Sequence, residues 1–190
     1  MQDRQLARLA EAADRSELRQ LVDLYGRAID RRDFTLLRSL YWDDATEEHG
    51  NMFRGTADEY VSWVEGALAM NEMTVHYAVN TLFALDGDYA EGEVCKVSYH
   101  RLTGDPKTGD PVREVTTGSR SLDRYARRNG VWKFLHRYVV LDWAEQRDAD
   151  TSAYASFAAN SPPGRVDGED ASFTRLRFFR PGSFGAYRPD

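Results

Sequence analysis

The segment REVTTGSRSLDRYARRNGVWKFLHRYVVLDW, residues 113–143, decides the fold of this chain. Both of its halves are rich in β-branched and aromatic residues, which favour strands. Asn129–Gly130, which lies between them, is a dipeptide typical of a tight hairpin turn. The segment therefore predicts two antiparallel strands, over residues 113–125 and 131–143.

Two further strand-like runs precede this hairpin. Residues 75–85 and 89–100 are again β-rich, and the Asp-Gly-Asp sequence at 86–88 supplies the turn between them. The polar, Pro- and Gly-marked stretch 103–111 reads as an exposed connection to the next strand. Together the runs predict a meandering, mostly antiparallel sheet.

Three helices are predicted before the sheet, each with a capping residue. Apolar residues recur at helical spacing after Ser16, a candidate N-cap, and Asp33 can cap a short second helix. Thr56 and Glu59 have the spacing of a capping box for the third. A short strand is expected from residue 41 to Phe53. The expected helices cover residues 16–30, 33–40 and 56–68. Helices followed by a meander indicate an α+β domain with helices on one face of a curved sheet.

The last part of the chain differs in composition from the rest. From about Ala144, proline, glycine and small residues dominate, but five large apolar side chains interrupt them: Phe173, Leu176, Phe178, Phe179 and Phe184. We therefore expect one domain over residues 1–143, and an extension over 144–190 that packs on the core or on a neighbouring subunit.

Composition narrows the classes of function. The chain has 190 residues, of which 42% are hydrophobic, enough for one core, and a formal net charge of -6. An acidic chain without a basic patch is not expected to bind nucleic acid or a membrane surface. The N-terminal residues MQDRQLARLAEAADR lack the apolar core of a signal peptide, so we expect a cytoplasmic protein.

The sequence contains no motif for a metal or a nucleotide. Cys95 is the only cysteine, and the four histidines form no HxH or HExxH grouping. GxGxxG, GxxxxGK[ST] and GxSxG motifs are absent as well. We therefore expect a protein that works without a cofactor and without a metal.

Four segments resemble one protein family. They are LYGRAIDRRD (24–33), WDDA (42–45), TVHY (74–77) and DRYARRNGVWKFLHR (123–137). In this order they are similar to the SnoaL-like branch of the NTF2-like superfamily, which contains scytalone dehydratase, bile-acid 7α-dehydratase and hexachlorocyclohexane dehydrochlorinase. The resemblance covers roughly residues 10–143. It implies a cone-shaped α+β barrel that admits a small molecule, and a His/Asp pair that performs cofactor-free elimination.

By position, the resemblance assigns four catalytic candidates. Asp30 matches the family aspartate and His76 the histidine that takes a carbon-bound proton. Tyr25 matches a residue beside the leaving group, and Arg137 a pocket arginine that stabilises negative charge. The residues alone also allow structural roles: a helix end for Asp30, a strand histidine for His76, a core tyrosine for Tyr25 and a surface ion pair for Arg137.

Strand alternation adds candidates for substrate binding. Residues two apart share a face of a strand, so three polar groups are expected to act together. They are Lys96, Ser98 and His100; Thr117, Ser119 and Ser121; and Glu47 and His49. If these faces line the pocket, it is wet and suits an oxygenated substrate. A slip of one residue instead turns Cys95, Val97 and Tyr99 inward.

The pattern as a whole favours a cofactor-independent lyase. We expect dehydration, or loss of another small group such as formaldehyde, from an oxygenated aromatic or alicyclic small molecule. Three alternatives stay open: a non-catalytic small subunit of an aromatic-ring dioxygenase, which has the same fold, a pure ligand-binding module, and an isomerase. The resemblance further implies a homo-oligomer, a trimer or alternatively a dimer.

Overall fold

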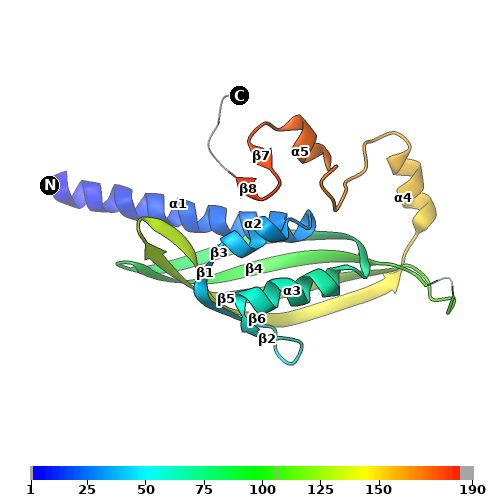
Figure 1. The fold of residues 1–190 in the computed structure, drawn as a ribbon, viewed down its shortest axis with the longest axis horizontal. Coiled ribbons are helices and arrows are strands. Elements are labelled where there is room, and N and C mark those ends of the chain that lie inside the picture. Colours follow the sequence, from blue (N-terminus) through cyan, green and yellow to red (C-terminus); the bar gives the residue numbers. More distant parts are fainter. Residues whose placement is uncertain (1, 106, 185–190) are drawn as a thin grey trace.

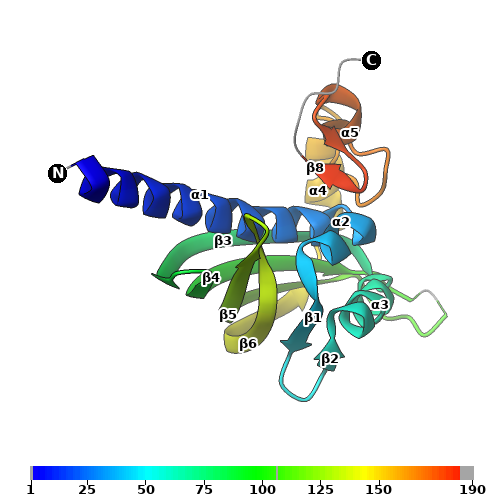
Figure 2. The ribbon, with the colours of Figure 1, turned by 60° about the vertical axis from the view of Figure 1, so that its left-hand side comes forward.

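A curved six-stranded sheet with three helices on one face forms the body of the protein (Figures 1 and 2). The computed structural model describes residues 2–105 and 107–184. The helices are α1 (Gln2–Asp30), α2 (Phe34–Ser39), α3 (Ala57–Leu68), α4 (Thr151–Ala158) and α5 (Ala171–Arg175). The strands are β1 (Tyr41–Glu48), β2 (Arg54–Thr56), β3 (Asn71–Asp86), β4 (Tyr89–Leu102), β5 (Arg113–Arg128), β6 (Val131–Asp148), β7 (Phe179–Arg180) and β8 (Ser183–Phe184). The architecture is the predicted α+β class.

The sheet has the order β2-β1-β6-β5-β4-β3, and only the β1–β6 pair is parallel. The predicted hairpin is confirmed, because Asn129 and Gly130 have the positive φ angles, 52° and 78°, that its turn requires. One boundary differs from the prediction. β6 continues to Asp148, and Ala144 pairs with Thr117 inside the sheet. The extension thus begins after residue 148, because a hydrogen-bonded ladder continues where the apolar pattern of the sequence has ended.

The first helix is longer than predicted. α1 begins at Gln2, so Ser16 lies inside it and is not an N-cap. The exposed residues of its first half face water and give no apolar periodicity, although Ala, Leu, Arg and Glu favour a helix there. Figure 2 shows this half extending beyond the sheet. All the buried residues of α1 lie in its second half, from Leu18 to Asp30. Before them, Asp14 accepts hydrogen bonds from Arg127 and Trp132 of the sheet.

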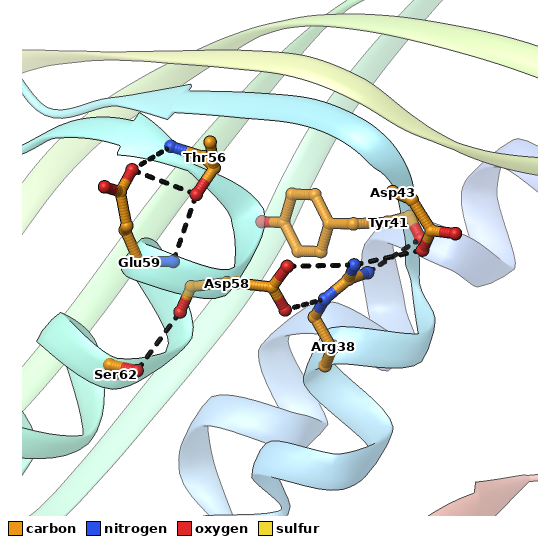
Figure 3. Close-up of polar contacts among 7 residues, drawn as sticks. All are labelled: Arg38, Tyr41, Asp43, Thr56, Asp58, Glu59 and Ser62. Atoms are coloured by element: carbon orange, nitrogen blue, oxygen red, sulfur yellow. Dashed lines mark hydrogen bonds and ion pairs between the residues drawn. The ribbon is translucent and has the colours of Figure 1, made fainter.

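The caps of the next two helices are confirmed. The Asp33 carboxylate accepts a hydrogen bond from the Leu36 amide, 3.0 Å away. Thr56 and Glu59 form the predicted capping box of α3 (Figure 3). The same figure shows the Arg38 guanidinium of α2 held by the carboxylate of Asp58 on α3. These contacts fix α2 and α3 relative to each other.

The predicted strand from residue 41 to Phe53 is wrong in its second half. β1 ends at Glu48, and the chain reverses through Gly50, whose φ is +55°. The His49 amide donates to the Phe53 carbonyl across this turn, at 2.8 Å, and the short strand β2 follows. Gly50 thus converts one predicted strand into a hairpin, because glycine accepts the left-handed conformation without strain.

The C-terminal extension packs on α1 and α2 of its own chain. The Arg27 guanidinium lies between the rings of Phe173 and Phe179, with 4.9 Å and 4.8 Å to the centroids. Asp170 pairs with Arg31 at 3.2 Å. The Gly182 amide donates to the Asp33 carboxylate, 2.8 Å away. The extension thus contacts the core of its own chain, one of the two predicted docking partners. Within the described residues, no helix is long and apolar enough to cross a bilayer.

Candidate functional site

Asp30 and His76 form a hydrogen-bonded dyad. Asp30, the last residue of α1, reaches the edge strand β3 and accepts from His76 twice. Its Oδ1 lies 2.7 Å from the ring Nδ1, and its Oδ2 lies 2.8 Å from the backbone amide. An edge strand has amides without a strand partner, and the carboxylate satisfies one of them. With Nδ1–H donated to Asp30, Nε2 carries the lone pair that can accept a proton.

The local chain geometry brings these two residues together. Gly26 lets α1 lie close to β3, because a Cβ at this position would stand 3.2 Å from the His76 carbonyl oxygen. After Asp30 the chain turns through Arg32, which has a φ of +53°. The Arg32 guanidinium then donates to the Thr74 hydroxyl of β3 at 2.8 Å. The end of α1 is thus held against β3 on both sides of the dyad, by close packing at Gly26 and by the hydrogen bond from Arg32 to Thr74.

Arg137 lies at the centre of the core, paired with Asp123. Its Nε and Nη2 each lie 2.7 Å from a carboxylate oxygen, and both side chains are almost fully buried. The Tyr125 hydroxyl donates to the same carboxylate at 2.7 Å. Burial alone would lower the pKa of Arg137, but Asp123 raises it well above its usual value. Arg137 is thus a permanent buried cation, and its Nη1 has no hydrogen-bond partner in the part of the chain that the structure describes.

Tyr25 connects this cation to a second buried carboxylate. The Arg137 guanidinium lies over the Tyr25 ring, 4.0 Å from its centroid. The Tyr25 hydroxyl contacts the Tyr60 hydroxyl in a short hydrogen bond and lies 3.4 Å from Glu47. Burial and the charge of Glu47 raise the pKa of Tyr25 far above its usual value. The phenol is therefore protonated at neutral pH and able to donate.

Glu47 is fully buried, and hydroxyl and imidazole groups surround it. Tyr41 donates to it in a short hydrogen bond, and His49 Nε2 lies 2.8 Å from Oε1. The His49 ring stacks on Tyr60 at 5.3 Å. The predicted pair Glu47 and His49 is thus brought together, but it supports the far side of Tyr25 and is not part of the cavity beside His76.

A cavity of about 70 Å³ lies between α1 and the sheet. Four predicted site residues line it: Tyr25, His76, Lys96 and Arg137. The remaining lining residues are Val22, Asp23, Gly26 and Ala78. Asp30 stands behind His76. The structure therefore places the four catalytic candidates, three of them as lining residues, around one small space.

The inward face of β4 and β5 is the predicted polar one. Lys96 pairs with Ser119 and Ser98 with Thr117, and both serines are buried. The alternative register, with Cys95, Val97 and Tyr99 inside, is thus not the one in the structure. His100 follows on the same face, and its ring packs edge-on against His76 at 5.3 Å. Burial, followed by the neighbouring His76, lowers the pKa of His100 to about 4.

Lys96 differs from the other charged groups of the site. Burial, followed by the nearby charge of Arg137, lowers its pKa to about 8. In the part of the chain that the structure describes, its ammonium group makes no ion pair or hydrogen bond, whereas Arg137 is held by Asp123. Lys96 is thus an inward-facing cation without a carboxylate partner.

The sequence analysis missed Asp123 and the three other buried tyrosines. Asp123 shares the alternation of Ser119 and Ser121, which is the signal that could have identified it as inward-facing. Tyr41, Tyr60 and Tyr125 look like ordinary core aromatics in the sequence. Only the structure shows that the hydroxyls of Tyr41 and Tyr125 donate to Glu47 and Asp123, and that the Tyr60 hydroxyl meets that of Tyr25. Among the described residues, no group of three His, Cys, Asp or Glu side chains is arranged to hold a metal ion.

Comparison with known proteins places these observations in a family. A model of the SnoaL-like domain matches residues 10–138. The chain belongs to the SnoaL-like domain family. The match ends before the extension, so α4, α5 and the small β7–β8 hairpin lie outside the family domain. No curated protein matches the sequence significantly.

Solved structures agree on the fold. A hexachlorocyclohexane dehydrochlorinase, LinA type 2, superposes with a TM-score of 0.65 at 20% identity, covering 74% of this chain and 93% of that one. A candidate scytalone dehydratase from Novosphingobium aromaticivorans gives 0.63 at 18%, covering 78% and 93%. An NTF2-like protein with a cystatin-like fold, from the same organism, gives 0.61 at 20%, covering 79% and 92%. The SnoaL-like domain of this chain therefore has the NTF2-like fold.

Proposed function

We propose that the protein is a cofactor-independent lyase that eliminates water, or another small group such as formaldehyde, from an oxygenated aromatic or alicyclic molecule. The observation that carries this proposal is the Asp30–His76 dyad beside a cavity lined by Tyr25 and Arg137. Two of the structural matches bear names of enzymes that perform eliminations, which is consistent with it. A non-catalytic subunit would need neither a dyad with a free Nε2 nor a cavity beside it.

In the proposed reaction His76 Nε2 takes a proton from a substrate carbon. The electron pair of that C–H bond forms the new double bond, and the leaving group departs with the electron pair of its own bond. For loss of formaldehyde from a 1,3-diol the base takes the proton of the terminal hydroxyl instead. The O–H electron pair then forms the C=O bond of formaldehyde, the C–C pair forms the new C=C bond, and the other hydroxyl leaves as water. Asp30 holds the ring with Nδ1–H directed at its carboxylate, which fixes the tautomer and stabilises the imidazolium that forms. The substrate carries no covalent bond to the protein at any step.

Tyr25 and Arg137 act on the other end of the reaction. The protonated Tyr25 hydroxyl, which contacts Tyr60 and Glu47 in the structure, exchanges one of these contacts and donates to the departing oxygen, so that hydroxide leaves as water. The Glu47 contact orients this phenol. Arg137 supplies a fixed positive charge beside the Tyr25 ring, which stabilises negative charge on the leaving group or on a substrate oxygen. Because Asp123 holds it in place, no reorganisation is needed when that charge develops.

A screen tests this proposal directly. The protein is incubated with β-hydroxylated aromatic and alicyclic compounds, and with phenolic 1,3-diols, in deuterium oxide, and the products are analysed by mass spectrometry. We expect a product lighter by water or, from the 1,3-diols, by water and formaldehyde together, formed by the wild type and not by His76→Gln. The matched control is His136→Gln, since His136 lies on the opposite, outer side of β6. Turnover that survives in His76→Gln contradicts the proposal.

We also propose that the protein forms a homotrimer or, failing that, a dimer, through the outer face of the sheet. Leu82, Leu122 and Tyr138 lie in one row across β3, β5 and β6, with Glu93 of β4 between the two leucines, and each of the three is more than a third exposed. Such an exposed row is typical of an association surface. Light scattering at micromolar concentration tests this, and the mass of a monomer contradicts it.

A further inference from the structure

We propose that Lys96 and Arg137 form an anion-binding subsite, and that the substrate presents an ionised oxygen, a phenolate or a carboxylate, to it. This inference rests on the proposed function and narrows its substrate class. Both side chains line the cavity beside His76, one from β4 and one from β6. A substrate oxygen bound there lies in the same cavity as the proposed base.

The charge balance of the cavity wall favours an anionic ligand. Among the described residues Lys96 makes no ion pair. The nearby carboxylates are occupied: Asp123 by Arg137, Glu47 by its hydroxyl and imidazole donors, and Asp23 by Arg19 at 3.1 Å. An unpaired ammonium group inside a protein is costly unless a ligand or water compensates it. The cavity wall therefore carries one positive charge, on Lys96, that no carboxylate of the described residues compensates.

Arg137, the other cation of the cavity wall, has an unused hydrogen-bond donor. Arg137 is 1% exposed, and two of its nitrogens donate to Asp123. The third, Nη1, is buried and has no hydrogen-bond partner among the described residues. Buried guanidinium N–H groups are almost always satisfied, so Arg137 has one donor left over. Lys96 and Arg137 both line the cavity and are the two cationic groups available to an oxyanion there.

The size and surroundings of the cavity also suit a charged oxygen. Its volume of about 70 Å³ suits one functional group, since a water molecule in the liquid takes up about 30 Å³. Ser119, which pairs with Lys96 across the β4–β5 ladder, adds a polar group on the same inward face. A charged oxygen fits this position better than an apolar group, because an apolar group would leave Lys96 uncompensated.

Binding of chromogenic and plain probes tests the subsite without any turnover. 4-Nitrophenol reports its ionisation by its yellow colour, and 4-nitroanisole is its methyl ether, which cannot ionise. We expect the wild type to increase the ionised fraction of 4-nitrophenol and to bind it at least 10-fold more tightly than 4-nitroanisole. Calorimetry with benzoate and benzamide separates a carboxylate preference from a phenolate preference.

Variants then assign the effect to Lys96. Lys96→Met keeps the length of the side chain and is expected to weaken binding of the preferred anion roughly 10-fold to 100-fold, the loss of one charge-assisted hydrogen bond. Lys107→Met removes the same charge from an exposed loop and is the matched control, expected to bind as the wild type does. His76→Gln is expected to keep the anion preference, so failure of the lyase proposal can be told apart from failure of the subsite.

Three results overturn the proposal. The first is a wild type that binds neither 4-nitrophenolate nor benzoate, and the second is one that binds the neutral analogues as tightly as the anions. The third is Lys96→Met with unchanged affinity for the preferred anion. If Lys96→Met does not fold, the comparison of anions with neutral analogues on the wild type still decides between the two outcomes.

Discussion

Two buried carboxylates of this protein serve different purposes, although each makes two hydrogen bonds to one residue. Asp123 faces Arg137, which is cationic at any pH of interest, and both side chains are almost fully buried. Asp30 faces His76, whose second nitrogen remains free, and the His76 side chain is 15% exposed beside the cavity. The Asp123–Arg137 pair is shut off from solvent and keeps its charges, whereas the Asp30–His76 pair can exchange a proton.

The difference lies in what each carboxylate holds. A guanidinium cannot give up its proton in a protein, so the Asp123–Arg137 pair supplies charge and position only. An imidazole held by one nitrogen keeps the other for acid–base chemistry. The same local arrangement thus gives a structural element in one place and a candidate base in the other. Substitutions at the two carboxylates should separate stability from reactivity.

The largest effect on stability is expected at Asp123. Asp123→Asn leaves the Arg137 cation buried without a counter-charge, which typically costs about 3–5 kcal/mol. Urea denaturation followed by tryptophan fluorescence measures the free energy of unfolding. Asp142→Asn is the control, since Asp142 is an exposed partner of Arg120, and little or no loss is expected there because solvent screens such a pair. Equal losses for the two variants would contradict the structural role of Asp123.

Lys96 sharpens the comparison, because it is an inward-facing cation without such a carboxylate. Its pKa of about 8 in the folded protein lies below 10.5, so the unfolded chain binds the proton more readily. The resulting destabilisation is fully present below pH 8 and disappears as the pH rises past 10.5. Lys96→Met is therefore expected to raise the free energy of unfolding by about 3 kcal/mol at pH 7. The gain should vanish near pH 11, and a loss at pH 7 would contradict this account.

His100 offers a smaller, pH-dependent test on the cavity side. Its pKa of about 4 lies below 6.5, so protonation favours the unfolded chain, and stability falls as the pH drops from 6.5 towards 4. At pH 5 this effect amounts to about 2 kcal/mol. His100→Gln should flatten that part of the stability profile and leave stability at pH 8 nearly unchanged. Denaturation curves at pH 8, 6 and 5 check this, and an unchanged acid slope would show that other groups cause it.

Much of the fold could be predicted because its signals are local. The Asn129–Gly130 turn, the Asp33 cap and the Thr56–Glu59 capping box each depend on residues within a few positions of one another. Alternation along β4 placed Lys96 on the same face as Ser98 and His100, but it left open whether that face points inward, because a slip of one residue reverses it. Exposed helix leaves no apolar pattern, and therefore the first half of α1 was not predicted.

The Asp123–Arg137 pair shows why the rest of the site was out of reach. If β5 and β6 paired without irregularity from the Asn129–Gly130 turn onward, Asp123 would lie opposite His136. A bulge between Arg124 and Tyr125 shifts the register by one residue, so that Asp123 faces Arg137. No local sequence pattern predicts such a bulge. The charges that meet across the core therefore depend on a backbone irregularity, whereas Asp30 and His76 were predicted from family resemblance.

A double-mutant cycle on Asp30 and His76 tests the central claim most directly, once the screen has supplied a substrate. His76→Ala is expected to lower kcat about 100-fold to 10,000-fold, while the affinity for substrate changes little. Asp30→Asn should cause a similar loss by releasing the wrong tautomer. The account predicts that the double variant is hardly slower than either single one, because both changes disable the same base. Losses that multiply, or near-normal turnover in His76→Ala, would contradict it.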